Sequence, residues 1–343
     1  AGSKLATHPA VEKQNFCPMP NKAIALGLVG LGLVSASWDA ASLLHIRPRE
    51  SLGQFAPSGD FDPPVLGPGS RTPPGGIDDL DMRLLLEDNR GACHTVLLTT
   101  VFGSRPDPQG RQRSPPTFEY MEGYYRSVMS VPGGKTRAFI FYDTLPEEVL
   151  RNYSTRDGAV TFIKVDISSV GPDMGLNDLR FLVYEREMKK HPEWETVFMT
   201  DSHDVIILHD PCLFVARTPD KIFVGAQKSR LGTFGQMRPQ FQAMGGKYLE
   251  WWNAHKDRRV LNAGILGGRR SKVLDVLAEM NSVFLDPMLA ARRNGSTVKV
   301  NMAVINYVVR RQFPDEYDVV VGTPLHSRFG AYENHTNVYF RHK

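Results

Sequence analysis

The chain has 343 residues, of which 41% are hydrophobic and 23% are charged. This composition is that of a globular protein long enough for one large domain with appendages, and it excludes disorder throughout. The formal net charge of +4 arises from 41 basic and 37 acidic residues without a long run of one sign, which argues against a nucleic-acid-binding protein.

The first apolar segment, Ala23–Trp38, follows Lys22 and contains no charge before Asp39. It is short for a helix that must cross about 30 Å of hydrocarbon, unless Ala40–Leu44 extends it. A signal anchor, a cleaved signal peptide and a buried helix all fit this pattern. Lys13 and Lys22 would stay cytosolic under the positive-inside rule, which favours the anchor. We therefore expect residues 1–48 to be a cytosolic segment and membrane anchor, and the rest to be lumenal.

Residues 49–87 have the composition of a flexible stem, with dense proline and glycine such as Pro73–Gly76 and no apolar periodicity. From Asp88 onward, segments typical of strands alternate with segments typical of helices. This alternation predicts an α/β domain at 88–343 with a mixed, mainly parallel sheet flanked by helices.

The elements of this domain follow from periodicity and flanking residues. The pattern predicts strands at Thr95–Phe102, Arg137–Tyr142, Val160–Ile167 and Thr196–Thr200, and helices at Phe118–Met129, Glu147–Tyr153 and Asn177–Lys190. The last of these helices has Phe181, Tyr184 and Met188 on one face and takes Asn177 as its expected N-cap. A later helix is predicted at Ser271–Phe284, with an apolar stripe that indicates core packing.

Two carboxylates follow the strand Thr196–Thr200, in the cluster Asp201-Ser202-His203-Asp204. The cluster stands at the carboxyl end of the strand, where ligands bind in open α/β sheets. A divalent cation explains two carboxylates at this place, since Mg²⁺ and Mn²⁺ take one or two carboxylates together with diphosphate oxygens. A solvated Asx turn between two strands explains the same spacing.

The stretch Val197–Ile206 resembles the Asp-x-x-Asp variant of the metal-binding motif in GT-A glycosyltransferases, including the glycosyltransferase domain of collagen lysyl hydroxylases. The resemblance covers Thr95 to Lys343 and implies a Rossmann-like GT-A fold in a single catalytic domain. It also implies transfer of a sugar from a nucleoside diphosphate sugar, which we expect to be a uridine one, to a hydroxyl of a glycan or glycoprotein. The implied cofactor is Mn²⁺ or Mg²⁺, and the implied location is the Golgi or endoplasmic reticulum membrane.

Two further segments match the family in order. Leu261–Gly267 resembles the segment beside the donor sugar and acceptor, which implies sugar contacts for Asn262 and a close backbone approach at Gly264. A strand with a glycine bulge is the structural alternative. Asn301 stands where many relatives carry an acidic pair; here the acidic residue is missing, and Asn301 is the remaining candidate for contact with sugar or acceptor.

The chain ends in Asn337–Lys343, which resembles the last strand of the family. The resemblance implies that His342 is the third metal ligand, beside Asp201 and Asp204, and that Lys343 offsets charge on the departing nucleoside diphosphate. A polar tail is the alternative interpretation. His326 is a competing candidate for the histidine ligand.

Other positions follow from their place in the fold that the resemblance implies. Thr99 and Thr100 end the first strand, near the expected uracil or ribose, and Asp143 ends the second strand, where it can face the base. Arg180 resembles the basic residue that reaches the ribose or phosphate in these enzymes. The alternatives are core threonines, a turn-forming aspartate and an exposed helix arginine.

Three cysteines, Cys17, Cys93 and Cys212, are too few for a disulfide scaffold and lack the spacing of a zinc site. We expect small buried or unreactive thiols. If Cys17 lies across a membrane from the others, only Cys93 and Cys212 can pair.

Three glycosylation sequons are compatible with the secretory pathway: Asn152-Tyr153-Ser154, Asn294-Gly295-Ser296 and Asn334-His335-Thr336.

Two other functions compete with glycosyl transfer. The missing acidic residue near Asn301 leaves room for a noncatalytic protein that binds a sugar or nucleotide. A nucleotidyltransferase shares the metal dependence, but Gly103–Pro108 is a poor match to its glycine-rich, lysine-containing loop. The expected partners are the donor, a glycan or glycoprotein acceptor and, through the anchor, a membrane.

Overall fold

The computed structural model describes residues 93–104, 117–131, 135–168, 174–286, 289, 299–327 and 337–342. All of them fall within one compact unit, Arg71–Lys343. The expected anchor and stem, residues 1–48 and 49–87, lie outside these ranges. Among the helices described, none is both long enough and apolar enough to cross a membrane.

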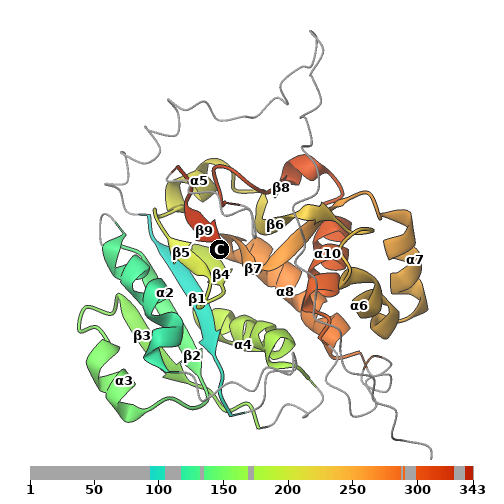
Figure 1. Ribbon diagram of the computed structural model, residues 1–343. Coiled ribbons are helices and arrows are strands. Elements are labelled where there is room, and N and C mark those ends of the chain that lie inside the picture. The colour runs from blue at the N-terminus through green and yellow to red at the C-terminus, as the bar shows by residue number, and fades with distance from the viewer. Residues whose placement is uncertain are drawn as a thin grey trace, which may run out of the picture. The chain divides into compact units, whose positions relative to one another are not determined.

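A seven-stranded mixed sheet lies at the centre of this unit, in the order β3-β2-β1-β4-β7-β6-β8 (Figure 1). Its strands are β1 Thr95–Val101, β2 Arg137–Tyr142, β3 Val160–Lys164, β4 Thr196–Thr200, β6 Ile222–Arg230, β7 Arg259–Arg269 and β8 Val319–Val320. Neighbouring strands are parallel, except that β7 runs antiparallel to both β4 and β6. The architecture is α/β and is compatible with a Rossmann-like fold, which agrees with the expected fold class at this level.

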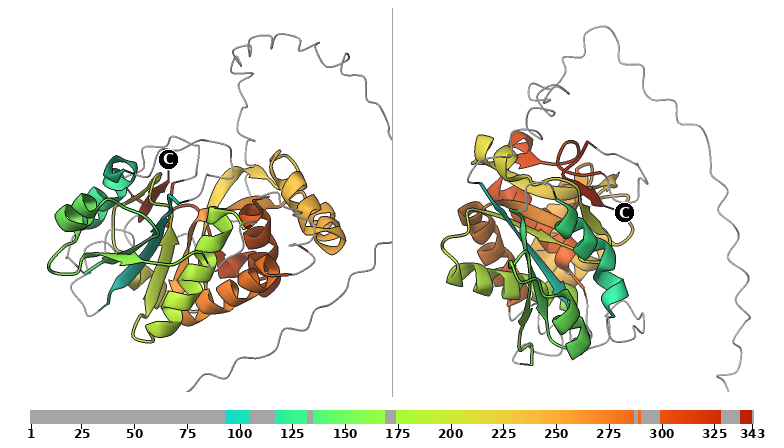
Figure 2. Two further views of the ribbon diagram at one scale, coloured as in Figure 1. Left: turned by 90° about the horizontal axis from the view of Figure 1, so that it is seen from below. Right: turned by 90° about the vertical axis from the view of Figure 1, so that its left-hand side faces the viewer.

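Helices cover both faces of the sheet. They are α2 Phe118–Ser130, α3 Glu147–Tyr153, α4 Leu176–Lys190, α5 Cys212–Arg217, α6 Met237–Met244, α7 Gly246–Ala254, α8 Arg270–Phe284 and α10 Asn301–Gln312, with a 3₁₀ turn at Glu316–Asp318. One core joins the sheet to α4, α6, α7, α8 and α10, and the other joins it to α2, α3 and α5. Figure 2 shows α2 and α3 at one end of the sheet and α6 and α7 at the other.

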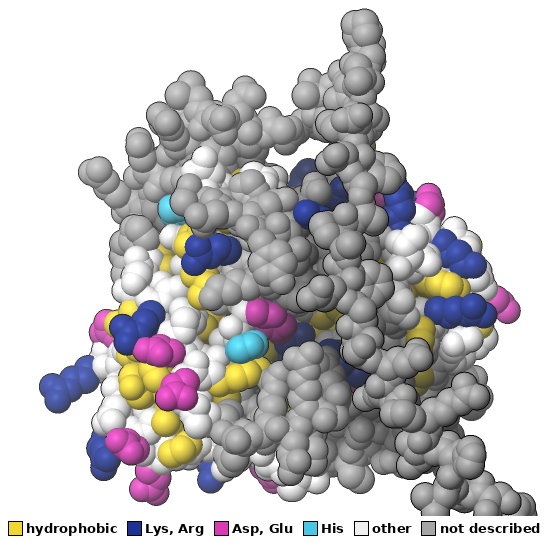
Figure 3. Space-filling model, viewed as in Figure 1, with side chains coloured by type: hydrophobic (Ala, Val, Ile, Leu, Met, Phe, Trp, Pro, Cys, Tyr) yellow, Lys and Arg dark blue, Asp and Glu magenta, His cyan; other side chains and the backbone are white. Residues whose placement is uncertain are grey.

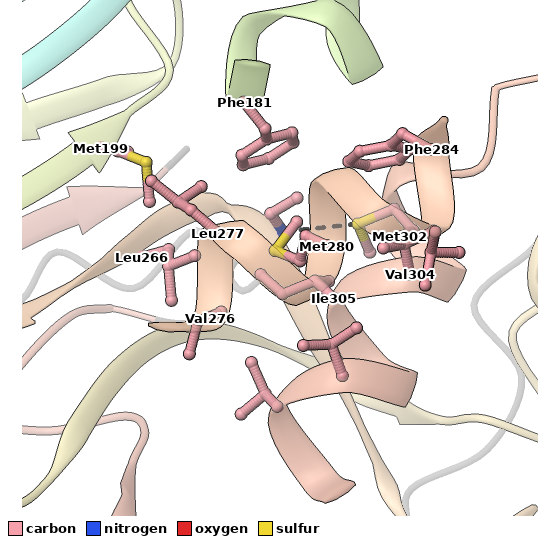
Figure 4. Packing of buried hydrophobic residues seen from close by; sticks show 14 of the residues in the cluster. Phe181, Met199, Leu266, Val276, Leu277, Met280, Phe284, Met302, Val304 and Ile305 are labelled. Carbon is pink, nitrogen blue, oxygen red and sulfur yellow. Dashed lines mark hydrogen bonds between the residues drawn. The ribbon is translucent and has the colours of Figure 1, made fainter. Parts of the chain in front are cut away.

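Strand β4 belongs to both cores because its side chains alternate between the two faces. Val197 and Met199 point into the core under α4 and α8, while Phe198 points into the other. In the first core the rings of Phe181 and Phe284 stack with their centroids 5.8 Å apart (Figure 4). All five residues of β4 are buried, as expected for a central strand covered on both faces.

A small second sheet pairs β5, Val205–Ile207, with β9, Phe340–His342, in antiparallel register. Val205 lies opposite His342, and Ile207 lies opposite Phe340. The ring of Phe340 is fully buried and its centroid lies 4.9 Å from that of Phe198. This packing brings the far end of the sequence beside the residues that follow β4.

Most predicted elements are confirmed, including β2, α3 and β4 at both bounds. Five predicted bounds are wrong, and four of these by a single residue. Strand β1 ends at Val101, α2 ends at Ser130 and α8 begins at Arg270. The third strand ends at Lys164 and not at Ile167, because Asp166 accepts a hydrogen bond from the amide of Ser168 and turns the chain. Helix α4 begins at Leu176 with Gly175 as N-cap, so Asn177 is not the cap.

The expectation of unpaired thiols is wrong for Cys93 and Cys212, which form a disulfide with their Cα atoms 5.8 Å apart, while Cys17 lies outside the described residues. The bridge ties the residue two positions before β1 to the first residue of α5. Beside it, the buried carboxylate of Asp210 accepts hydrogen bonds from the hydroxyls of Thr95 and Thr136 and from the amide of Cys212. The starts of β1, β2 and α5 are thus fastened together.

The disulfide closes a loop of 119 residues, so its removal should destabilise the fold. We expect the double variant Cys93→Ser/Cys212→Ser to lose about 2–5 kcal/mol of unfolding free energy, because the unfolded chain regains conformational freedom. Thermal or denaturant unfolding measures this loss. Asp220→Asn, which changes an exposed aspartate between α5 and β6, is the control and should unfold like the wild type. A double variant as stable as the wild type would contradict the bridge.

Candidate metal centre

Three of the predicted ligands meet in space. Asp201 follows β4, Asp204 precedes β5, and His342 ends β9. One ligand atom from each lies within 4.8 Å of the others, and Nε2 of His342 is 3.8 Å from Oδ1 of Asp204. Opposite ligands of an ion bound at about 2.1 Å lie about 4.2 Å apart, so small side-chain rotations let all three share one cation. The group can therefore hold a metal ion.

The pairing of β5 with β9 positions His342. Its backbone is held on the other side by Ser327, whose hydroxyl accepts a hydrogen bond from the His342 amide at 2.9 Å and lies 3.4 Å from its carbonyl oxygen. The side chain of His342 is buried, although only Lys343 follows it in the sequence. A polar tail is therefore not what the structure shows at His342, while Lys343 lies outside the described residues.

The imidazole of His342 has the protonation state that a metal ligand needs. Burial lowers its pKa from 6.5 to about 4; the charges of His326 and Arg180 act in the same direction, and Asp201 opposes them. The ring is consequently neutral at pH 7, with a nitrogen lone pair available for a cation.

Arg180 lies beneath the site and connects two of its parts. Its guanidinium donates one hydrogen bond to Oδ1 of Asp201 and another, at 2.9 Å, to the carbonyl oxygen of Ala263. The side chain is almost completely buried. Burial disfavours the charged guanidinium, but nearby acidic groups, Asp201 foremost, outweigh it and raise the Arg180 pKa. Arg180 is thus a fixed cation under the site and not an exposed helix residue.

Strand β7 has a bulge next to the metal ligands. Gly225 of β6 pairs with Asn262 of β7, whereas the preceding residue, Val224, pairs with Leu266. Residues 263–265 of β7 are therefore inserted between the partners of two successive residues of β6. The carbonyl of Gly264 accepts a hydrogen bond from the amide of Asp201 at 3.0 Å, and the Gly264 amide donates to Oδ1 of Asn262 at 2.7 Å. The bulge that was the structural alternative for this segment is therefore present, and it lies against the candidate ligands.

Gly264 has no room for a side chain. A Cβ atom there would lie 2.6 Å from Cε1 and 2.8 Å from Nε2 of His342. The absence of a side chain at Gly264 is what lets the imidazole lie against the bulge.

The first two strands contribute threonines and an aspartate at the same edge of the sheet. The buried hydroxyl of Thr99 donates to the carbonyl oxygen of Thr200 at 2.8 Å, and the hydroxyl of Tyr184 lies 3.5 Å from that of Thr100. Asp143 is half-buried and accepts hydrogen bonds from the amides of Gly103 at 2.8 Å and of Ser104 at 3.0 Å. Asp143 thereby joins the loops that follow β1 and β2.

Asn301 and His326 have local partners that set them apart from the ligand group. Asn301 is buried at the start of α10, where its Oδ1 accepts a hydrogen bond from the amide of Met302. In His326, Nδ1 lies 2.6 Å from the carbonyl oxygen of Ser327, and Nε2 lies 3.1 Å from the amide nitrogen of Gly322 and 3.2 Å from the carbonyl oxygen of Val224. With both ring nitrogens engaged, His326 is not the histidine of this centre.

His203 stands between the two aspartates in the sequence but turns away from them. Its ring stacks on Tyr120 of α2 with the centroids 4.5 Å apart, and its side chain is exposed. The described group of candidate ligands does not include it.

Two buried polar residues that were not predicted from the sequence fasten α10 in place. The carboxylate of Asp178, on α4, accepts from the amides of Val300 and Asn301 and so caps α10. Asn306 exchanges hydrogen bonds of 2.8 Å with the backbone of Leu261 and fastens α10 to β7. A signal existed only for Asn306, which interrupts the otherwise apolar run of α10.

Comparison with known proteins adds no family assignment. No protein-family model matches the chain, and no curated protein matches it.

The described surface in Figure 3 shows acidic and basic side chains interspersed, in agreement with the balanced composition.

Replacement of Gly264 by alanine should displace the imidazole of His342 and weaken metal binding. We expect the Gly264→Ala variant to bind Mn²⁺ at least about tenfold more weakly, the loss typical when the surroundings of a metal ligand are disturbed. Electron paramagnetic resonance titration of free Mn²⁺ measures the affinity. Gly246→Ala is the matched control, because a methyl group there meets no described atom within 4 Å apart from its own helix backbone and chain neighbours. Equal Mn²⁺ affinity in the two folded variants would overturn this view of Gly264.

Proposed function

We propose that this chain is a metal-dependent glycosyltransferase of the GT-A type, which moves a sugar from a nucleoside diphosphate sugar to an acceptor hydroxyl. The observation that supports it most is the meeting of Asp201, Asp204 and His342 around one point. This point lies where the parallel strand β4 ends, the usual position for ligands of an open α/β sheet.

The kind and number of ligands agree with this chemistry. Two carboxylates and one neutral imidazole suit Mn²⁺, which accepts both oxygen and nitrogen ligands. Three protein ligands leave coordination positions for diphosphate oxygens. A bound divalent ion supplies charge stabilisation for the departing nucleoside diphosphate. The residues around it hold the ligands in place: Arg180 fixes Asp201, and the bulge at Gly264 gives His342 its space.

The carboxyl ends of the parallel strands, beside the candidate metal ligands, have groups that can bind a nucleotide-sugar donor. Asp143 joins the loops after β1 and β2, so these loops and the candidate ligands belong to the same end of the parallel strands. The backbone and amide groups of Asn262 and Gly264 lie beside His342, where they can meet a sugar. We assign the nucleotide to the loops and the sugar to the bulge. Lys343 would act on the diphosphate from just beyond His342.

The proposed location is the lumen of the Golgi or endoplasmic reticulum. A disulfide between Cys93 and Cys212 is typical of proteins that fold in an oxidising compartment. Asn152, in the first of the three sequons, is exposed on α3 and therefore accessible to glycosylation. Both features support a protein of the secretory pathway, and we propose a glycan or glycoprotein of that pathway as its acceptor.

A screen of nucleotide sugars tests the proposal. We expect Mn²⁺-dependent hydrolysis or transfer with at least one donor, uridine diphosphate sugars first among them. Asp204→Asn should lower kcat/KM by about 100-fold or more, because it removes one charged metal ligand. Asp220→Asn, which changes an exposed aspartate between α5 and β6, is the matched control and should keep wild-type activity.

Three outcomes would contradict the proposal. Undiminished turnover after chelation of metal would exclude the metal centre from the reaction. Full activity of Asp204→Asn would do the same for that residue. Calorimetric binding of uridine diphosphate and Mn²⁺ without turnover of any donor would favour a noncatalytic binding protein.

A further inference from the structure

A cavity opens between α7, α8 and α10, which lie together on one side of the sheet in Figure 1. The cavity has a volume of about 520 Å³, within the range of about 300–1,000 Å³ that is usual for small-molecule sites. Its lining shares no residue with the candidate metal centre. The side chains that matter here are Lys247, Tyr248, Glu279, Leu285, Tyr307 and Arg311.

Two tyrosines form a rigid floor. Tyr248 and Tyr307 are 5% and 8% exposed, and their rings meet edge to face with the centroids 4.8 Å apart. Leu285, at the end of α8, contributes an apolar wall and is 57% exposed. It is one of the few large apolar side chains that the described part of the chain leaves in water. A ligand that covers Leu285 therefore gains from apolar burial.

Cations flank this floor. The ammonium of Lys247 lies 4.9 Å from the ring centroid of Tyr248, and the guanidinium of Arg311 lies 5.1 Å from that of Tyr307. Arg311 also donates to the hydroxyl of Tyr307 at 2.9 Å and lies 3.4 Å from Oε1 of Glu279. Glu279 accepts a further hydrogen bond of 2.8 Å from Gln312. These contacts fix the polar groups before any ligand arrives, which lowers the entropy lost on binding.

The charges of the lining balance. Lys247 and Arg311 supply two cations, and Glu279 and Asp286 supply two carboxylates. A strongly ionic ligand would meet repulsion as well as attraction here. A sugar hydroxyl can donate one hydrogen bond and accept another at the same time. In this cavity it can donate to a carboxylate and accept from a neighbouring ammonium or guanidinium group. The apolar C–H face of a pyranose ring can pack on Leu285 and the tyrosine edges.

We propose that this cavity binds a neutral oligosaccharide. The site is separate from the metal centre, and binding requires neither the cation nor a nucleotide. Its most direct use, to hold the acceptor glycan outside the reaction site, rests on the proposed glycosyltransferase function.

The test uses the full chain with a chelator present, so that it does not depend on the metal centre. Arrayed neutral and acidic oligosaccharides identify a neutral trisaccharide, whose affinity is then measured by saturation-transfer difference NMR titration. We expect binding that high salt leaves unchanged, since no net charge is involved. Glu279→Gln and Ser282→Tyr should each weaken it at least tenfold, the first by removing a charged acceptor and the second by filling the cavity from an exposed lining position.

The matched control is Glu250→Gln, an exposed glutamate of α7 outside the lining, which should bind like the wild type. Asp204→Asn should also keep the trisaccharide, even if it loses donor turnover, which separates the two proposals. The inference is overturned if no neutral oligosaccharide binds, if only acidic oligosaccharides or peptides bind, or if binding survives in Ser282→Tyr.

Discussion

The buried guanidinium of Arg180 constrains the whole candidate centre. From one position on α4 it donates to the carboxylate of Asp201 and to the carbonyl oxygen of Ala263, so the end of β4 and the bulge of β7 cannot separate. Loss of the partner of a buried charge destabilises a fold by about 3–5 kcal/mol. This cost opposes any movement of the end of β4 or of the β7 bulge away from Arg180. The amide of Asp201, bonded to the Gly264 carbonyl, reinforces the same junction.

The third ligand depends on packing instead of on charge. Phe340 inserts beside Phe198, and β9 then pairs with β5 so that His342 reaches the bulge. The Phe198 ring in turn needs Gly267 opposite it on β7, because any Cβ there would overlap the ring. Hydrophobic burial and two glycines therefore position an imidazole whose neutral state is itself a result of burial.

Local pattern predicts those parts of the molecule whose causes are local. The apolar run of β4 followed by Asp201 and Asp204 identified a strand that ends in two carboxylates. The periodicity of apolar residues predicted most of the helices and strands. What could not be predicted depends on distant partners: the bridge from Cys93 to Cys212, separated by 119 positions, and the cap that Asp178 provides for α10.

The same limit explains the uncertainty between the two histidines. His326 and His342 have the same chemistry, and only the three-dimensional structure shows one bonded through both ring nitrogens to the backbone and the other beside two aspartates. Resemblance to a family pointed to His342, whereas spacing along the chain could not distinguish a ligand near the terminus from a polar tail. The bulge at Gly264, by contrast, was visible in the sequence as a structural alternative.

The central claim is that one cation is shared by the end of β4 and the end of the chain. Electron–nuclear double resonance of bound Mn²⁺ tests it most directly, because it detects a directly coordinated imidazole nitrogen. We predict one ¹⁴N coupling that disappears in His342→Gln and persists in His203→Gln, which alters the exposed histidine inside the aspartate cluster. A spectrum without ¹⁴N coupling, or a coupling that follows His203 instead of His342, would contradict the account.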